Sequence, residues 1–170
     1  GTVGGSIFGR FGVSDVLTVC LEMGTQVELY HAGMFPLKEF IDMPYDNDIL
    51  VALHVAKKPI RIAYLSQRNT ATDFPVVACA VSEYDGSLHV SIGARPVHAR
   101  MEELPPGSGK PDGFGKQLPA GSQNDEALVK KLASWCADQF TYGSNRRSGA
   151  DYRAHVADVL IRRAICSFEK

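Results

Sequence analysis

Long hydrophobic runs are absent from this sequence, and none approaches the roughly 20 apolar residues that a helix needs to cross a bilayer. An excess of charge of one sign is absent too, because 18 Lys and Arg residues face 19 Asp and Glu residues for a formal net charge of -1. Such a balance provides no basic field to attract nucleic acid or acidic membranes. The first residues also lack the pattern of a signal peptide. We therefore expect a cytoplasmic protein that binds neither nucleic acid nor membrane.

Cysteine is scarce, and no two cysteines form a C-x-x-C pair. The four thiols lie far apart in apolar segments, at Cys20, Cys79, Cys136 and Cys166. This pattern is typical of buried, reduced cysteines in a cytosolic protein, and it excludes an iron–sulfur motif within the chain.

Metal-binding and nucleophilic motifs are missing as well. The five histidines form neither an H-x-H nor an H-E-x-x-H arrangement, so we expect no metal site. Asp46 and Asp48 flank Asn47 as in a calcium loop, but the closing glutamate is absent and a solvated turn is the simpler interpretation. No G-x-S-x-G or Cys–His signature indicates nucleophilic catalysis, so the sequence identifies no catalytic residue.

The pattern of apolar residues indicates the fold class. With 170 residues the chain has the length of one domain or two small ones. Alternating or β-branched segments predict strands over residues 25–30, 49–55, 60–66, 73–83 and 87–94. Helical spacing predicts helices over residues 15–23, 36–41, 125–140 and 150–168. Hairpin-paired strands followed by helices indicate an α+β fold.

Turn-forming residues divide the chain. Pro59 marks a change of unit, so we place one domain over residues 1–59 and a second over residues 60–170. Asp85-Gly86 predicts a tight hairpin, and the Pro- and Gly-rich segment 104–124 predicts a mobile loop. In the last helix, the residues expected on the core-facing stripe are Tyr152, Val156, Val159, Leu160 and Ala164, and Ile161, Ile165 and Phe168 broaden it.

Glycine is concentrated at the start of the chain, where four glycines fall between residues 4 and 12. Because glycine has no Cβ, the N–H groups of Gly4 and Gly5 can approach a bulky ligand, and such groups bind phosphate oxygens. Ser14 or Asp15 caps the helix that follows, and Asp15 is suited to accept hydrogen bonds from ligand hydroxyls. The pattern is neither a Rossmann fingerprint nor a P-loop. The alternative is a glycine-rich loop that turns sharply before a helix and binds nothing.

A second polar segment runs from residue 67 to residue 77 and includes Arg68 and Thr70. It carries more hydrogen-bonding groups than a connector needs, which is typical of a loop near a ligand. The alternative is a polar loop that precedes a buried strand.

The run Thr2-Val3-Gly4-Gly5-Ser6-Ile7 resembles the second flavin-binding loop of the FAD subunits of the molybdenum hydroxylases, the family of xanthine dehydrogenase and carbon monoxide dehydrogenase. That loop reads T-[IV]-G-G-N-[IL], with an aspartate nine residues after the asparagine. Asp15 falls in this register, and Ser6 replaces the asparagine.

Other segments resemble the same family in the same order. Residues 67–77 are similar to a polar loop that ends in D-[IF]-[AP]-x-V, although Leu65 stands where a lysine is common. Residues 92–97 are similar to the strand I-A-[LF]-G-G-V-A-P-x-P. Residues 145–164 are similar to the C-terminal helix motif R-[AG]-S-A-x-Y-R, with Gly149 in place of the serine. In the family, that last motif is mostly packing and capping.

The resemblance implies the second lobe of a two-lobed FAD-binding domain, followed by an antiparallel sheet with C-terminal helices. The family's subunit has an N-terminal lobe with a first phosphate loop, and this chain begins after it. We therefore interpret the chain as the C-terminal portion of such a subunit, either expressed as a piece or encoded separately. Alone, it is expected to fold, to bind FAD poorly and to be inactive.

The resemblance also implies a function. An oxidoreductase of this family passes electrons from iron–sulfur clusters through FAD to an acceptor such as NAD. The residues expected to contact FAD are Gly4, Gly5, Ser6, Ser14 and Asp15 at the pyrophosphate and ribityl chain, with Arg68 and Thr70 near the ring. The expected partners are the N-terminal FAD lobe, a 2Fe-2S subunit and a molybdopterin subunit. The alternative is a non-catalytic assembly or interaction module that keeps the fold without binding flavin.

Overall fold

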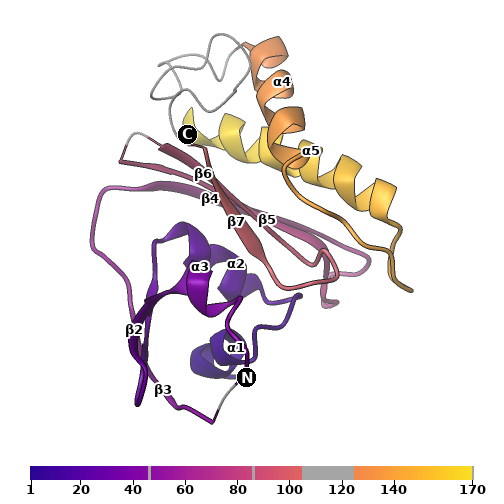
Figure 1. Cartoon of the computed structure of the whole chain (residues 1–170). Coiled ribbons are helices and arrows are strands. Elements are labelled where there is room, and N and C mark those ends of the chain that lie inside the picture. The colour runs from indigo at the N-terminus through magenta and orange to yellow at the C-terminus, as the bar shows by residue number, and fades with distance from the viewer. Residues whose placement is uncertain (46, 86, 105–124, 170) are drawn as a thin grey trace.

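The computed structural model describes residues 1–45, 47–85, 87–104 and 125–169 (Figure 1). Their strands form two antiparallel sheets, one ordered β2-β1-β3 and the other β4-β5-β6-β7. The strands are β1 (Gln26–Leu29), β2 (Gly33–Pro36), β3 (Leu50–His54), β4 (Arg61–Arg68), β5 (Pro75–Tyr84), β6 (Ser87–Gly93) and β7 (Arg100–Leu104). The helices are α1 (Val3–Phe8), α2 (Asp15–Glu22), α3 (Leu37–Phe40), α4 (Glu126–Ala137) and α5 (Ala150–Cys166), with a final 3-10 turn at Ser167–Glu169. The expected α+β class is thereby confirmed.

The four-stranded sheet lies between two layers of helix (Figure 1). Helix α5 packs on β4 and β5 with α4 against it, while α2 packs on β5 and β6 from the opposite face. Because both faces of the sheet are covered, every residue of β5 except Tyr84 is buried. A second apolar core fills the space between the first three helices and the three-stranded sheet. The division into two domains at residue 59 stays a prediction.

The glycine-rich start of the chain is helical, which corrects the expectation of a loop. Thr2 has an extended backbone and its hydroxyl accepts a hydrogen bond from Gly5 N at 3.0 Å, so it acts as the N-cap of α1. Ile7 is completely buried and anchors the helix on the second core. A local cap and one apolar anchor therefore outweigh the low helix propensity of Gly4 and Gly5.

Helix α2 has Ser14 as its N-cap, one of the two residues predicted for that position. Ser14 Oγ accepts a hydrogen bond from Leu17 N at 3.1 Å, and Asp15 is the first helical residue. The helix ends near Gly24, whose positive φ of 60° is the conformation expected of a C-terminal glycine. Leu17 and Leu21 are buried, so this helix is held by its apolar side.

Strands β2 and β7 were not expected. The chain turns at His31 and Ala32, and Gly33, with a positive φ of 82°, opens β2. Pro36 ends β2 and precedes α3, instead of taking the first helical position. Strand β7 is short, polar and paired with β6 alone in the described part of the sheet, so its sequence carries little strand pattern.

The predicted hairpin between β5 and β6 is confirmed. Tyr84 pairs with Ser87, and Asp85 has a φ of 51°, as a two-residue turn requires. Gly86 lies outside the described residues. So does the predicted mobile loop, apart from Leu104, which ends β7.

The core-facing side of α5 differs from the predicted stripe. The buried residues of this helix are Arg153, Ala157, Leu160, Ile161, Ala164 and Ile165. Tyr152 is 51% exposed, and Arg153 takes the inward position beside it. Leu160, Ile161, Ala164 and Ile165 are buried as predicted. The difference lies at the start of the helix, where Arg153 and not Tyr152 meets the sheet. Across the ranges that the structure describes, no helix is long and apolar enough to cross a membrane.

Candidate ligand-binding site

A hollow of about 430 Å³ lies where the start of α2 faces the loop between β4 and β5. Its lining residues are Ser6, Phe11, Val13, Ser14, Asp15, Val16 and Phe74. Two aromatic side chains border it, with Phe11 63% exposed and Phe74 58% exposed. A volume of this size, apolar walls and a few polar groups are typical of small-molecule sites.

A somewhat larger hollow of about 490 Å³ lies between α3 and β7. It contains charged side chains of both signs and none of the residues predicted from the sequence; it is lined by Lys38, Glu39, Ile41, Asp42, Met43, Arg100, Met101 and Glu102. The hollow beside α2 is therefore the better candidate, because it combines exposed aromatic rings with three of the predicted residues.

Asp15 is the charged group of the candidate hollow, and its carboxylate already has partners within the chain. Oδ1 accepts a hydrogen bond from the hydroxyl of Tyr64, and Oδ2 lies 2.7 Å from Nη2 of Arg68. Burial, together with the neighbouring carboxylate, raises the pKa of Tyr64, so this hydroxyl keeps its proton and donates. The Arg68 guanidinium offsets the negative charge that Asp15 brings to the site.

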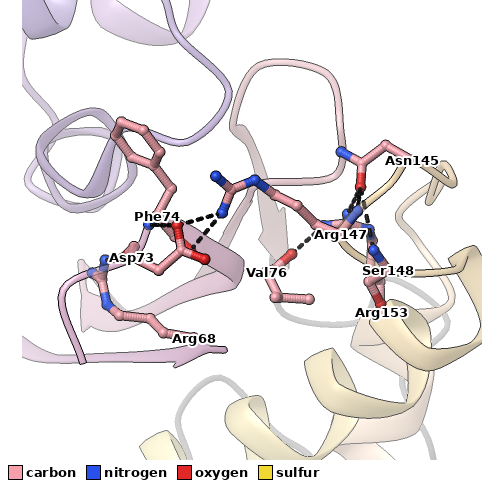
Figure 2. Close-up of polar contacts among 8 residues, drawn as sticks. All are labelled: Arg68, Asp73, Phe74, Val76, Asn145, Arg147, Ser148 and Arg153. Carbon is pink, nitrogen blue, oxygen red and sulfur yellow. Dashed lines mark hydrogen bonds and ion pairs between the residues drawn. The ribbon is translucent and has the colours of Figure 1, made fainter. Parts of the chain in front are cut away.

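Arg68 also reaches the loop that precedes β5. Its Nη1 donates to the carbonyl oxygen of Asp73 at 2.6 Å. The Asp73 carboxylate accepts from Phe74 N at 2.7 Å and pairs with Arg147 Nη1 at 2.7 Å (Figure 2). The hydrogen bond from Arg147 is the main cause that lowers the pKa of Asp73. These charged contacts connect the start of α2 to the segment before α5 through Asp15, Arg68, Asp73 and Arg147.

The segment before α5 is fixed by a buried arginine. Arg153 is 1% exposed, and its guanidinium donates to the carbonyl oxygens of Val76 and Ala94. It also donates to Asn145 Oδ1 at 2.6 Å, which in turn accepts from Arg147 N at 2.9 Å (Figure 2). One arginine thus holds β5, the end of β6 and the loop that carries Arg147.

The structure brings together some of the predicted site residues. Ser6, Ser14 and Asp15 line the hollow, and Arg68 binds Asp15 from its edge. Gly4 and Gly5 lie in α1 and are not among the lining residues. Thr70 is exposed in the loop between β4 and β5 and does not line the hollow either. Whether any of these residues contacts a ligand stays a prediction.

Sequence reasoning missed three residues of this region: Phe11, Phe74 and Arg147. Phe74 belongs to the polar segment that was singled out, but only its hydrogen-bonding neighbours were considered. Arg147 belongs to the C-terminal motif, which was interpreted as packing and capping. The signal in the sequence was the presence of phenylalanines beside the predicted binding segments, because an aromatic ring exposed beside a binding loop often contacts a ligand. Within the described residues, no group of three or more His, Cys, Asp or Glu side chains is placed to hold a metal ion.

Comparison with known proteins bears on the fold. No protein-family model and no curated protein matches the sequence. Quinoline 2-oxidoreductase from Pseudomonas putida 86 superposes with a TM-score of 0.77 at 16% identity, over 98% of this chain and 60% of that chain. A carbon monoxide dehydrogenase from Hydrogenophaga pseudoflava that lacks the Mo-pyranopterin moiety has a TM-score of 0.72 at 16% identity, over 97% and 59% of the two chains. Reconstituted CO dehydrogenase from Oligotropha carboxidovorans has a TM-score of 0.72 at 17% identity, over the same shares.

These matches have a plain consequence. The chain has the fold of a portion of quinoline oxidoreductase and CO dehydrogenase chains, and it spans about 60% of their length. The resemblance drawn from the sequence motifs is therefore confirmed for the fold. At such low identity the likeness leaves function open.

Proposed function

We propose that this chain is part of an FAD-binding subunit of a molybdenum-hydroxylase-like oxidoreductase. In the assembled enzyme, electrons from iron–sulfur clusters on a partner subunit would reach an acceptor such as NAD through FAD. The observation that carries the proposal is the position of the hollow: in a fold shared over 98% of the chain with an oxidoreductase, it gathers Ser6, Ser14 and Asp15 between two exposed phenylalanines.

The composition of the hollow fits a flavin. Phe11 and Phe74 offer flat apolar surfaces at its border, which suit a planar aromatic ring. Hydroxyls and a carboxylate lie at the start of α2, where a ligand's polar tail needs hydrogen bonds. When bound, FAD supplies the electron-transfer chemistry, and the protein supplies binding and orientation.

The start of α2 also suits a diphosphate. Backbone N–H groups at a helix N-terminus favour anions, and the eight-residue α2 opens on the hollow through Ser14 and Asp15. A carboxylate at that place would repel phosphate, but Arg68 at 2.7 Å balances the charge of Asp15. Because the charges of Asp15 and Arg68 offset each other, the N-terminus of α2 is the dominant electrostatic feature of the hollow.

The length covered in the comparisons supports the expected partners. About 40% of each matched chain has no counterpart here, because this chain covers only 59–60% of them. We propose that a separate N-terminal lobe completes the flavin site, and that iron–sulfur and molybdopterin subunits complete the enzyme. A diphosphate held from one side only does not recover its desolvation cost, so the chain alone binds FAD poorly.

A flavin fluorescence titration tests the proposal. The chain is titrated with FAD alone and again with the N-terminal lobe of a relative of this fold added in trans, which is expected to tighten binding. Phe11→Ala should weaken binding in the presence of the lobe, whereas Tyr152→Ala, which removes another aromatic ring that is more than half exposed, should not. Micromolar or tighter binding by the chain alone would contradict the two-lobe arrangement. Absence of binding even with the lobe would instead favour a non-catalytic assembly module.

A further inference from the structure

Phe74 is a wall of the hollow that is only weakly supported by its own packing. Its side chain is 58% exposed, and it stands at the end of a polar loop immediately before β5. An exposed aromatic ring at a loop end has several rotamers available, and ordering it costs entropy when a ligand binds. A site that uses Phe74 therefore gains affinity if another residue holds the ring in place beforehand.

Arg147 contacts Phe74 twice directly and once through Asp73 (Figure 2). Its Nη1 pairs with Asp73 Oδ1 at 2.7 Å, the same oxygen that accepts from Phe74 N at 2.7 Å. Nη1 also donates to the carbonyl oxygen of Phe74 at 3.4 Å, and the guanidinium lies 5.5 Å from the centroid of the Phe74 ring. Both backbone polar groups of Phe74 and its ring are thus held by one guanidinium and its carboxylate partner.

The backbone of Arg147 is held by hydrogen bonds that lead to a buried arginine. Its backbone N–H donates to Asn145 Oδ1, which also accepts from the buried Arg153. Arg153 in turn is bonded to Val76, two residues beyond Phe74 on β5. The loop that carries Arg147 and the strand that follows Phe74 are therefore fixed against each other by the same buried side chain.

We propose that Arg147 is a positioning residue, which orders Phe74 as a wall of the hollow for a planar aromatic ligand. The identity of that ligand rests on the proposed flavin function, whereas the ordering of Phe74 does not. Arg147 and Asp73 have side chains that are 35% and 28% exposed, so their ion pair contributes little to global stability. Its effect should be local, on the loop and on ligand affinity.

The first measurement is hydrogen exchange in the chain without ligand, followed at the Phe74 amide. Arg147→Met keeps the apolar stem and removes the charge, and it should speed exchange there about tenfold, as expected for loss of a charged hydrogen-bond network. The matched control is Arg146→Met, which alters the exposed neighbouring arginine and should leave exchange unchanged. Arg147→Lys should restore protection only in part, since an ammonium cannot make the same forked contacts. Unchanged exchange in Arg147→Met would overturn the proposal.

The second measurement is a double-mutant cycle on FAD affinity with the N-terminal lobe present. If Arg147 acts through Phe74, Arg147→Met weakens binding in the natural protein and has no further effect in Phe74→Ala. Additive losses would mean that Arg147 acts on the ligand by another route and would overturn the positioning role. If the natural protein itself binds no FAD, the proposed function fails, while the exchange experiment still decides the role of Arg147.

Discussion

The carboxylate of Asp15, the first residue of α2, lies 2.7 Å from the guanidinium of Arg68, the last residue of β4. The two residues are 53 positions apart, and the sequence pointed to each of them separately as a candidate for ligand binding. Their pairing means that neither charge is presented alone. It also ties the helix that opens on the hollow to the loop that carries Phe74.

Replacing Asp15 with Asn tests this pairing. The variant keeps the shape of the side chain and loses the charge that Arg68 and Tyr64 recognise. Because the Asp15 side chain is 40% exposed, we expect a loss of only about 1 kcal/mol in the free energy of unfolding, measured by urea denaturation. Asp151→Asn is the control, since Asp151 occupies the first turn of α5 and is exposed. Equal losses in the two variants would contradict a specific role for the Asp15 pair.

Substitutions at Ser14 separate capping from ligand binding. Ser14→Ala removes the acceptor for Leu17 N and should lower the free energy of unfolding by about 1 kcal/mol, the usual cost of a lost N-cap. Ser14→Asp keeps a capping oxygen, so stability should stay close to that of the natural protein. It also adds a negative charge beside the hollow, so FAD binding in the presence of the lobe should weaken. Unaltered affinity in Ser14→Asp would place the diphosphate elsewhere.

Glu22 should make stability fall as the pH rises. It is completely buried at the end of α2, and its carboxyl group is bonded to the hydroxyls of Ser82 and Ser91. Burial raises the pKa of Glu22 to about 8 from an ordinary 4.5. The folded protein therefore holds a proton that the unfolded chain releases, so the contribution of Glu22 to stability is fully present below about pH 4.5 and is lost as the pH rises to about 8.

Glu22→Gln supplies the test of that pH dependence. Glutamine resembles the protonated acid and has no charge to bury, so the variant should be the more stable protein at pH 7, by a margin of the order of 2–3 kcal/mol. The margin should shrink towards pH 5 and grow towards pH 8, as followed by denaturant unfolding at each pH. A margin that does not change with pH would show that Glu22 titrates normally.

Arg153 should contribute more to stability than any other arginine of α5. Arg153→Met leaves the carbonyl oxygens of Val76 and Ala94 buried without their donor, which should cost about 2 kcal/mol or more. Arg163→Met alters an exposed arginine of the same helix and should change stability by less than about 0.5 kcal/mol. Thermal unfolding of both variants measures the difference. Similar melting temperatures would show that the buried guanidinium is dispensable.

Local features of this protein could be predicted from its sequence. The cap at Ser14, the glycine that ends α2 and the turn at Asp85 each depend on residues no more than four positions away. The strong apolar patterns of β5, β6 and α4 likewise define their elements, because burial on a sheet or helix face requires that spacing. Separated motifs in the right order were also enough to indicate the fold that the comparisons confirm.

Other features were decided only by the tertiary structure. Gly4 and Gly5 are helical because Ile7 reaches a core built largely from later segments, and β7 is a strand because β6 offers it an edge. The inward turn of Arg153 depends on carbonyl oxygens 59 and 77 positions away.

The sequence by itself therefore determined most of the elements, the α+β class and the stretch where a ligand was to be sought. The tertiary structure decided which charges meet, since Asp15 finds Arg68 and Asp73 finds Arg147 across 53 and 74 positions. The physical reason is the sequence separation over which each kind of interaction acts. Capping, turns and periodicity act over a few residues, whereas ion pairs and burial depend on which distant segments the topology brings together.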